Sequence, residues 1–536
     1  MDARYAVTNA TLFQGAAADP TATALAVSSG RIVCVGSNTD AEAAAGPGAR
    51  VLDLGGRFLC PGFVDCHVHL SWLAMTLAGR TVDCEGTRTL AEALQRVRDA
   101  MPRAVVGGWL RGRGWDKNQW PGDRFPTATD LDAATGDVPA ALASHDGHSV
   151  WGNSAALRVA GVTPQTADPA GGRLLRDAAG QPTGVLQEAA AALIWDAMPA
   201  PPVEEIAAAM REALPRLSAL GLTGLHNCEA GDGRSAVLQL RDSGALPLRI
   251  AHYHPAAQLD EVIERAQVTD HADECVRLGG LKAFVDGALG GQTAAMLEPY
   301  EGSGQAGLLT MEPQEFTELA RRATAAGLAL AVHAIGDRAV RMVLDGFVQV
   351  RNAWSGPWPR HRIEHAQHVH PDDQPRFGQL GVIASVQPAH LLADITTCER
   401  HLGERSRWAF PFRSLLQGGA RLAFGSDAPV ETVNPLVGLR SAVQRRRHDG
   451  TPVEGWYPEQ KLTVAEALRG YTLDAAYASC EEANKGSLEP GKLADFVILS
   501  RNPLTTPPDE LGDVRVEATV VGGRATYDPE DLFGPD

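Results

Sequence analysis

The chain has 536 residues, with 48 basic and 65 acidic side chains and a formal net charge of −17. A surface this acidic repels phosphate backbones and anionic lipid headgroups, so nucleic acid and membranes are not expected partners. No stretch approaches the roughly 18 apolar residues of a membrane span, and no secretion signal is visible. With eight scattered cysteines and no C-x-x-C pair, the sequence predicts a soluble cytoplasmic protein with free thiols.

The two ends of the chain carry short segments in which apolar and polar residues alternate, as in half-buried β-strands. These segments are residues 5–13, 24–36, 50–56, 494–500 and 514–527. Neither end has enough strands to fold alone. We therefore predict a small composite β-sandwich built from residues 1–58 and 486–536.

Between the two ends, β-rich apolar runs alternate with helical stretches. Eight runs occur, at residues 62–68, 221–227, 248–253, 279–285, 328–333, 362–366, 382–387 and 421–426. Eight is the number of parallel strands that closes a (β/α)8 barrel. Residues 59–485 are therefore predicted to form a TIM barrel of the α/β class.

One interval, from about residue 70 to residue 221, is far longer than a single strand-to-strand connection needs. We predict that the surplus is an insertion, at about 75–205, that covers the barrel mouth. Residues 89–101 within it have helical spacing, whereas residues 107–123 are rich in glycine and tryptophan and are expected to form an ordered loop. The tryptophans there are compatible with a pocket wall and with interior packing, and both interpretations stay open.

Histidines and an aspartate stand where several of the predicted strands end. His67 and His69 are two residues apart, so on a strand both imidazoles point to the same side. His333 ends the fifth strand, His365 lies near the end of the sixth, and Asp427 follows the eighth. Because the C-terminal ends of barrel strands meet at one mouth, these side chains are expected to converge on a site for a divalent cation.

Lys282 lies within the fourth predicted strand, among apolar residues. Burying an unpaired ammonium group is costly, so a lysine here would ordinarily be interpreted as reaching solvent or an ion-pair partner. The five residues at the other strand ends change that interpretation, and a role for Lys282 in the same site is favoured.

As an ordered set, several blocks resemble the amidohydrolase superfamily, and more narrowly its amidohydrolase-3 branch of YtcJ-like proteins and N-substituted formamide deformylases. The resemblance runs from about residue 5 to residue 525 and rests on GRGWDKNQWP, HDGHSVWGNSAAL, TGVLQEAA, KAFVDGALGGQTA, AVHAIGDRA, RIEHAQ, FGSDAPV and GSLEPGKLADFVILS. It implies His67, His69 and Asp427 as ligands of one cation and His333 and His365 as ligands of a second. It also implies that Lys282, in N6-carboxylated form, bridges the two.

The resemblance implies a metal-dependent amidohydrolase that cleaves a C–N bond outside peptides, of the amide or N-formyl type. A metal-activated hydroxide would attack, with Asp427 as general base and then general acid. Histidine and carboxylate ligands suit Zn²⁺, with one or two ions bound and two favoured. The expected partner is a small-molecule substrate, and monomer and homodimer both stay open.

Weaker signals point to substrate-binding side chains in two places. The candidates are Asp116, His145, His148 and Asn153 in the insertion, and Gln387, His390 and Asp394 after the seventh strand. A structural role within a hydrogen-bonded loop is the open alternative for these residues.

The alternative reaction on the same site is that of a deaminase or a cyclic-amide hydrolase. A non-catalytic scaffold is disfavoured, because such relatives lose ligands and this chain keeps all six.

Overall fold

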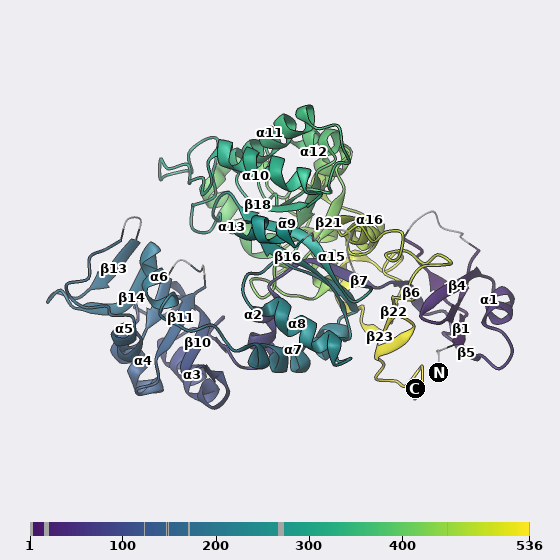
Figure 1. The fold of residues 1–536 in the computed structure, drawn as a ribbon, viewed down its shortest axis with the longest axis horizontal. Coiled ribbons are helices and arrows are strands. Elements are labelled where there is room, and N and C mark those ends of the chain that lie inside the picture. Colours follow the sequence, from purple (N-terminus) through teal and green to yellow (C-terminus); the bar gives the residue numbers. More distant parts are fainter. Residues whose placement is uncertain are drawn as a thin grey trace. The chain divides into compact units, whose positions relative to one another are not determined.

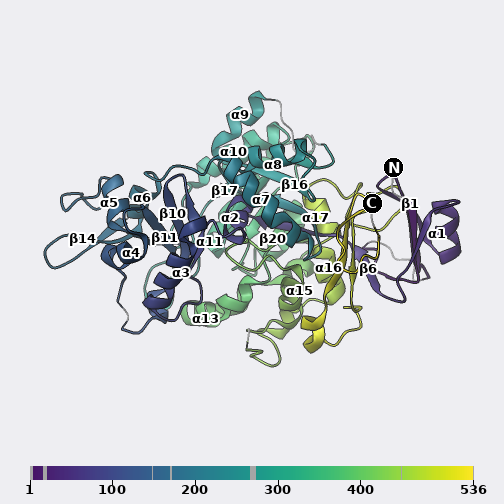
Figure 2. The same cartoon turned by 90° about the horizontal axis from the view of Figure 1, so that it is seen from below.

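The computed structural model describes residues 4–15, 21–122, 124–145, 147, 149–169, 172–265, 273–447 and 449–534. The chain divides into two compact units. The barrel unit comprises Met1–Leu70, Leu214–Ala230 and Leu240–Asp536, and the inserted unit comprises Ser71–Ala213 and Gly231–Gln239. Figures 1 and 2 show their helices and strands from two directions.

An eight-stranded parallel sheet forms the centre of the barrel unit, with the strand order β21-β20-β19-β18-β17-β16-β15-β7. The strands are β7 (Phe63–Val68), β15 (Leu222–Asn227), β16 (Arg249–Pro255), β17 (Val276–Phe284), β18 (Leu330–Ala334), β19 (Arg362–His365), β20 (Ile383–Val386) and β21 (Leu422–Phe424). A parallel bridge between Val68 and Ala428 nearly closes the ring between its two end strands. The predicted TIM barrel is confirmed, and each of the eight predicted runs overlaps one of its strands.

The barrel strands are recognisable in the sequence because they are buried on both faces. Every residue of β7, β15, β19, β20 and β21 is buried. Strands covered on both sides consist of nearly continuous apolar runs instead of alternating ones. Burial alone does not explain the polar residues that interrupt these runs, so each of them needs a structural or functional role.

Helices follow most of the barrel strands. Those between β7 and β18 are α2 (Leu70–Leu77), α7 (Val203–Ser218), α8 (Gly233–Asp242), α9 (Leu259–Glu264) and α10 (Pro313–Ala325). Those after β18 are α11 (Asp337–Ala353), α12 (Gln374–Leu380), α13 (His390–Leu402), α14 (Phe412–Gln417), α15 (Pro435–Gln444), α16 (Val464–Gly470) and α17 (Leu473–Ala478). As the sequence suggests, α10 begins at a proline, whose fixed φ suits the first helical turn.

Two more sheets of the barrel unit come from the ends of the chain. The first has the order β4-β3-β1-β5 and the second the order β2-β6-β22-β23-β24. Their strands are β1 (Arg4–Thr8), β2 (Thr11–Leu12), β3 (Ala24–Ser28), β4 (Arg31–Gly36), β5 (Arg50–Asp53), β6 (Phe58–Pro61), β22 (Phe496–Leu499), β23 (Val516–Val521) and β24 (Arg524–Tyr527), and α1 (Asn38–Ala45) lies after β4. Val7 and Leu25 share one apolar core with Phe496 and Ile498, so the two ends of the chain pack together.

The inserted unit has its own mixed sheet, with the order β13-β14-β12-β11-β10-β8 and with β9 paired to β10. Its strands are β8 (Val82–Asp83), β9 (Val105–Val106), β10 (Trp109–Trp115), β11 (Ala140–Ser144), β12 (Ser149–Gly152), β13 (Gly172–Arg176) and β14 (Pro182–Glu188). Its helices include α3 (Leu90–Ala104), α4 (Ala128–Thr135), α5 (Ser154–Val159) and α6 (Ala192–Trp195), and most of α2, α7 and α8 also lies within its bounds. The position of this unit over the barrel mouth stays a prediction.

The ordered loop predicted at residues 107–123 is only partly a loop, because it contains strand β10. Trp115 and Trp120 pack against Trp151, with ring centroids 6.3 and 6.4 Å away, and all three are buried. The indole nitrogen of Trp115 donates to the Leu142 carbonyl, 2.8 Å away. These tryptophans therefore build the core of the inserted unit, as aromatic residues with a satisfied polar end commonly do.

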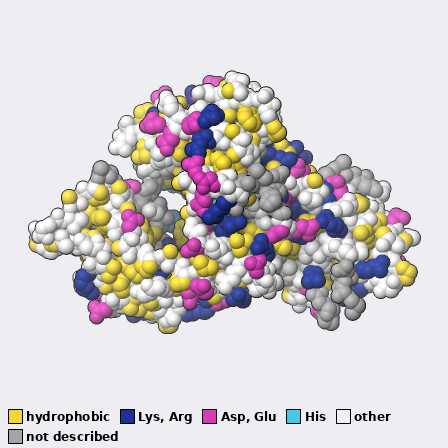
Figure 3. Space-filling model, viewed as in Figure 1, with side chains coloured by type: hydrophobic (Ala, Val, Ile, Leu, Met, Phe, Trp, Pro, Cys, Tyr) yellow, Lys and Arg dark blue, Asp and Glu magenta, His cyan; other side chains and the backbone are white. Residues whose placement is uncertain are grey.

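None of the described helices is long and apolar enough to cross a membrane. The eight cysteines are unpaired, and five of them are buried. On the face of the molecule drawn in Figure 3, the acidic and basic side chains of the described residues are interspersed with one another. On that face the described residues form no continuous basic surface.

Candidate metal centre

The first group of possible ligands joins the end of β7 to the loop after β21. The Nε2 atoms of His67 and His69 lie 3.4 and 3.0 Å from Oδ1 of Asp427. The three donor atoms lie within 4.8 Å of one another, and His67 and Asp427 are buried. Of the predicted ligands, these three are the ones that the structure brings into a single group.

A second group shares the same carboxylate. It consists of His365 at the end of β19, His390 at the start of α13, and Asp427. Nε2 of His390 lies 3.5 Å from Oδ2 of Asp427. One carboxylate oxygen of Asp427 thus faces His67 and His69, and the other faces His390.

His333 lies beside this second group without belonging to it. Its ring centroid is 4.6 Å from that of His365. Its Nε2 lies 3.1 Å from the carbonyl oxygen of Gly287 and 3.5 Å from Oδ1 of Asp286. A proton on Nε2 would satisfy that carbonyl and leave Nδ1 as the atom available to a cation.

Lys282 points into the same space from β17. Its Nζ lies 3.2 Å from Nε2 of His67 and 4.7 Å from the ring centroid of Phe284. Lys282 is buried, and burial lowers the pKa of its ammonium group. The neutral amine required for carboxylation is therefore more accessible here than on an exposed lysine.

Burial keeps most of the imidazoles of the site neutral. It lowers the pKa of His67 to about 4 and that of His333 to about 3, and it moves the pKa of His365 well below its usual value. For Asp427, burial acts in the opposite direction, but the neighbouring histidines outweigh it and hold the pKa well below its usual range. A carboxylate among neutral imidazoles is the protonation state that binds a divalent cation.

His390 is the exception among these histidines. Burial alone would lower its pKa, but the Asp427 carboxylate outweighs burial and raises that pKa to about 9. A cation that binds Nε2 of His390 at neutral pH must therefore displace a proton.

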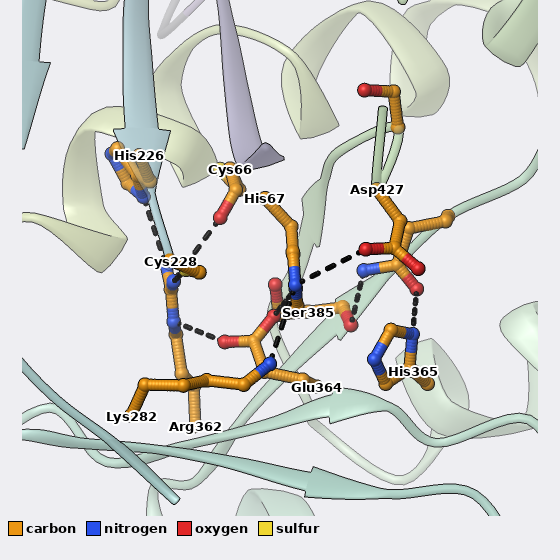
Figure 4. Close-up of polar contacts among 12 residues, drawn as sticks. Cys66, His67, His226, Cys228, Lys282, Arg362, Glu364, His365, Ser385 and Asp427 are labelled. Carbon is orange, nitrogen blue, oxygen red and sulfur yellow. Dashed lines mark hydrogen bonds and ion pairs between the residues drawn. The ribbon is translucent and has the colours of Figure 1, made fainter. Parts of the chain in front are cut away.

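Two buried side chains orient the histidines from behind, as Figure 4 shows for His67. Nδ1 of His67 lies 2.7 Å from Oε2 of Glu364, and Nδ1 of His365 lies 2.9 Å from Oε1 of Gln387. In each pair the imidazole donates and the oxygen accepts, which leaves Nε2 unprotonated and facing the site. For His67, this nitrogen lies beside Nζ of Lys282. Such outer contacts fix the tautomer and the ring orientation of a metal-binding histidine.

Glu364 is held in turn by Arg362, two residues earlier on the same strand (Figure 4). Nε of Arg362 lies 2.5 Å from Oε1 of Glu364, and its Nη1 donates to Nδ1 of His226, 2.8 Å away. Burial alone would raise the pKa of Glu364, but Arg362 and His67 outweigh it and lower that pKa to about 2. Glu364 is therefore ionised where it accepts from His67.

Sequence reasoning missed Arg362 and Glu364, although both lie in the segment RIEHA. The available signal was two charged residues, two positions apart, in a strand predicted to be buried on both faces. On a barrel strand such residues point to the same side. Charges placed there are almost never buried without partners.

The backbone bends sharply where the ligands leave their strands. His365, Ala366 and Asp427 have φ values of 71°, 42° and 61°, in the left-handed region that non-glycine residues rarely adopt. Strain of this kind is concentrated at functional sites and requires the surrounding structure to maintain it.

Asp65 provides part of that support. Its Oδ1 accepts from the backbone N–H groups of His67 and Ser426, at 3.0 and 2.9 Å, and so joins β7 to the segment that carries Asp427. The backbone approach is so close that a Cβ atom on Gly425 would lie 2.6 Å from the His67 nitrogen.

The predicted substrate residues Gln387 and Asp394, which follow β20, make different contacts. Gln387 is buried between His365 and the Ser385 carbonyl, to which its Nε2 donates at 3.3 Å. Asp394, on α13, accepts from Nε2 of Gln367 at 3.3 Å. The contacts of Gln387 favour the positioning of His365 over direct substrate binding.

In the inserted unit, Asp116 and His145 line a cavity of about 430 Å³ together with Glu85, Arg88 and Gln119. Nδ1 of His145 lies 3.4 Å from Oε1 of Glu85. His148, the third candidate here, lies outside the described residues. A substrate role for Asp116 and His145 stays a prediction.

Asn153, the fourth candidate in this unit, is fully buried and caps α5. Its Oδ1 accepts from the N–H groups of Ala140 and Ala156, at 3.1 and 2.8 Å. Its Nδ2 donates to Oγ1 of Thr135 and to the Val138 carbonyl, both at 2.8 Å. All four contacts are made within the inserted unit, which favours the structural alternative for this residue.

Asn153→Ala is therefore expected to lower the stability of the inserted unit by about 2–4 kcal/mol, through the lost cap and the buried groups left without partners. Thermal unfolding should show a lower Tm, while KM of the folded enzyme should stay unchanged. Asn153→Asp, which keeps the capping oxygen, should be less destabilised. A raised KM at an unchanged Tm would instead show that Asn153 binds substrate.

The separations around Asp427 fit a metal site, although the 3.0 Å contact with His69 is also a normal hydrogen-bond distance. Two ligands of one tetrahedral zinc ion, each at 2.0–2.1 Å from it, lie about 3.3 Å apart. The histidine nitrogens lie 3.0, 3.4 and 3.5 Å from the Asp427 oxygens. Imidazole and carboxylate donors are also the types that zinc and related divalent ions prefer.

Comparison with known proteins agrees with this chemistry. The profile of the amidohydrolase family matches residues 50–527. Among curated proteins, LONG AFTER FAR-RED 3 of Arabidopsis thaliana is 37% identical over 97% of this chain and 91% of its own length. The putative amidohydrolase YtcJ of Bacillus subtilis is 31% identical over 90% of this chain and 91% of its own length. The N-substituted formamide deformylase of Arthrobacter pascens is 32% identical over 95% of both.

A solved structure is similar along nearly the whole chain. It is an uncharacterized metal-dependent hydrolase from Pyrococcus horikoshii, with a TM-score of 0.80 and 27% identity over 95% of this chain and 99% of that one. The family match and this neighbour support a hydrolase, and they confirm the resemblance inferred from the motifs. The chain belongs to the amidohydrolase family.

Proposed function

We propose that the chain is a metal-dependent hydrolase that cleaves a non-peptide C–N bond of the amide or N-formyl type. The observation that carries the proposal is the buried Asp427 carboxylate, placed 3.0–3.5 Å from three imidazole nitrogens. The similarity to an N-substituted formamide deformylase supports the choice of bond.

His67, His69 and Asp427 would hold one divalent cation, for which Zn²⁺ is the best match to the donors. His365, with His333 beside it, would serve a second, and Lys282 as its N6-carboxylated form would bridge the two. A cation bound there lowers the pKa of water toward neutrality and polarises a carbonyl oxygen.

Asp427 is the residue proposed to move the proton. Its ionised carboxylate accepts a proton from the attacking water as the new C–O bond forms at the carbonyl carbon. When the C–N bond breaks, the same proton passes to the departing nitrogen, so the products are a carboxylic acid and a neutral amine. Glu364 and Gln387 keep Nε2 of His67 and His365 directed at the site throughout.

A hydrolysis screen of the zinc-loaded protein tests the proposal. N-formyl amines, N-acyl amines, cyclic amides and cyclic amidines would be offered, with release of amine, acid and ammonia measured separately. We expect amine and formate or another carboxylate from the first two classes. Ammonia from amidines, or ring opening alone, would show that the deaminase or cyclic-amide alternative is correct.

A further inference from the structure

We propose that His390 is a metal ligand, and that it shares a second cation position with His365 and Asp427. Asp427 would then bind one cation through each of its carboxylate oxygens. This inference rests on the proposed metal-dependent function, and it adds to the ligand set a residue that does not lie at a strand end.

The first argument is that the two carboxylate oxygens of Asp427 face different histidines. Oδ1 of Asp427 faces Nε2 of His67 and His69, whereas Oδ2 faces Nε2 of His390. The donor atoms of His365, His390 and Asp427 lie within 4.8 Å of one another. A single carboxylate with its oxygens facing two groups of imidazoles is the arrangement expected when it bridges two ions.

The second argument is the separation of 3.5 Å between His390 Nε2 and Asp427 Oδ2. This distance is too long for a good hydrogen bond, which would bring the two atoms to about 2.7–3.2 Å. It is close to the value of about 3.3 Å that separates two ligands of one tetrahedral ion.

The third argument is that Nε2 of His390 is buried and has no hydrogen-bond partner among the described residues. A buried polar atom left in that condition requires an explanation, such as a bound ion. Nε2 of His333, by contrast, already has the Gly287 carbonyl as a partner. That contact leaves Nδ1 of His333 available, so His333 can still serve beside the group. Among the described residues, His390 is the side chain whose donor atom lies within 4.8 Å of those of His365 and Asp427.

The position of His390 on the chain explains why a ligand can come from a helix. It is the first residue of α13, which follows β20, and the side chain of Gln387 between these elements already contacts His365. The short connection from β20 to α13 thus contains Gln387, which orients His365, and ends at His390, the other histidine of the second cation position.

The alternative is that His390 contacts substrate and no metal, and metal content separates the two roles. His390→Gln removes the imidazole and keeps a polar side chain. The matched control is His401→Gln, in the last turn of the same helix and half-buried. Each protein would be produced with zinc, purified without chelator and analysed for metal by mass spectrometry, with circular dichroism to verify folding.

We expect about two equivalents of zinc in the wild-type protein and in His401→Gln, and about one in His390→Gln. Two equivalents in His390→Gln would overturn the inference, and so would a single equivalent in the wild-type protein. Neither result would overturn the metal-dependent function. No bound ion in the wild-type protein would instead contradict the proposed function itself.

A second variant keeps the inference testable if His390→Gln folds poorly. His390→Cys replaces one zinc ligand by another, so it should retain both ions. After substitution with cobalt, it should also gain sulfur-to-cobalt charge-transfer absorbance that the wild-type protein lacks. A His390→Cys protein with two ions and no such absorbance would show that residue 390 does not bind metal.

Discussion

Asp427→Asn should lower kcat by about 1,000-fold, the largest effect on turnover expected from one substitution in this site. Asparagine keeps the shape of the side chain and one oxygen that can face a cation, but its amide accepts no proton at neutral pH. The pKa of Asp427 is held well below its usual range, so the wild-type residue is a carboxylate over the whole working range of pH. In protein that retains its metal, the loss should therefore fall on the proton-transfer step.

The measurement is kcat on the best substrate of the screen, with metal content and circular dichroism measured on the same preparation. Asp372→Asn is the control, because the Asp372 side chain is 82% exposed and pairs with His370, which is not a proposed ligand. It should retain wild-type turnover. An Asp427→Asn protein with kcat within tenfold of the wild-type value would show that another group moves the proton.

Glu364→Gln should reduce the free energy of unfolding by about 3–5 kcal/mol, because it leaves the Arg362 guanidinium buried without its counter-charge. Both side chains are almost completely buried, and the nitrogen and oxygen of the pair are 2.5 Å apart. A glutamine amide can still accept from Nδ1 of His67, but it lacks the negative charge that makes this imidazole a stronger ligand, so zinc affinity should fall by about 10–100-fold. Denaturant unfolding and zinc competition measure the two effects separately.

The double variant Arg362→Met with Glu364→Leu distinguishes packing from ligand positioning. Replacing a buried ion pair by apolar side chains of similar volume is often neutral or stabilising, so stability should recover. Zinc affinity should stay low, because neither new side chain can accept from His67. Recovery of both properties in the double variant would show that Glu364 has no role in orienting His67.

The barrel could be predicted because each of its strands is recognisable from a short stretch of sequence. Strands such as β20, with every residue buried, appear in the sequence as continuous apolar runs, and eight of them imply closure. Strand β10 was missed because Gly112 and Gly114 within WLRGRGW resemble loop residues. A Cβ atom on Gly112 would lie 2.5 Å from the Leu142 side chain, so these glycines permit close packing within the sheet.

The residues of the candidate site that lie at strand ends could be predicted from the sequence. The contacts that depend on the direction of a side chain could not. His67, His69 and Asp427 were found because their positions relative to the strands place them together. The pairing of Glu364 with His67 depends on how the barrel brings together β19 and β7, which are not neighbours in the sheet; the two residues are 297 positions apart in sequence. The proximity of His390 to Asp427 depends on where α13 begins, which hydrophobic periodicity locates only within a few residues.

Metal analysis of the wild-type protein, coupled to chelation and zinc restoration, tests the metal-dependent hydrolase most directly. Protein purified without chelator should contain a bound divalent cation and hydrolyse an N-formyl or N-acyl amine. Removal of the ion should abolish that activity, and added zinc should restore it. Protein without a bound ion, whose hydrolysis is unaffected by chelator and by zinc, would contradict the proposal.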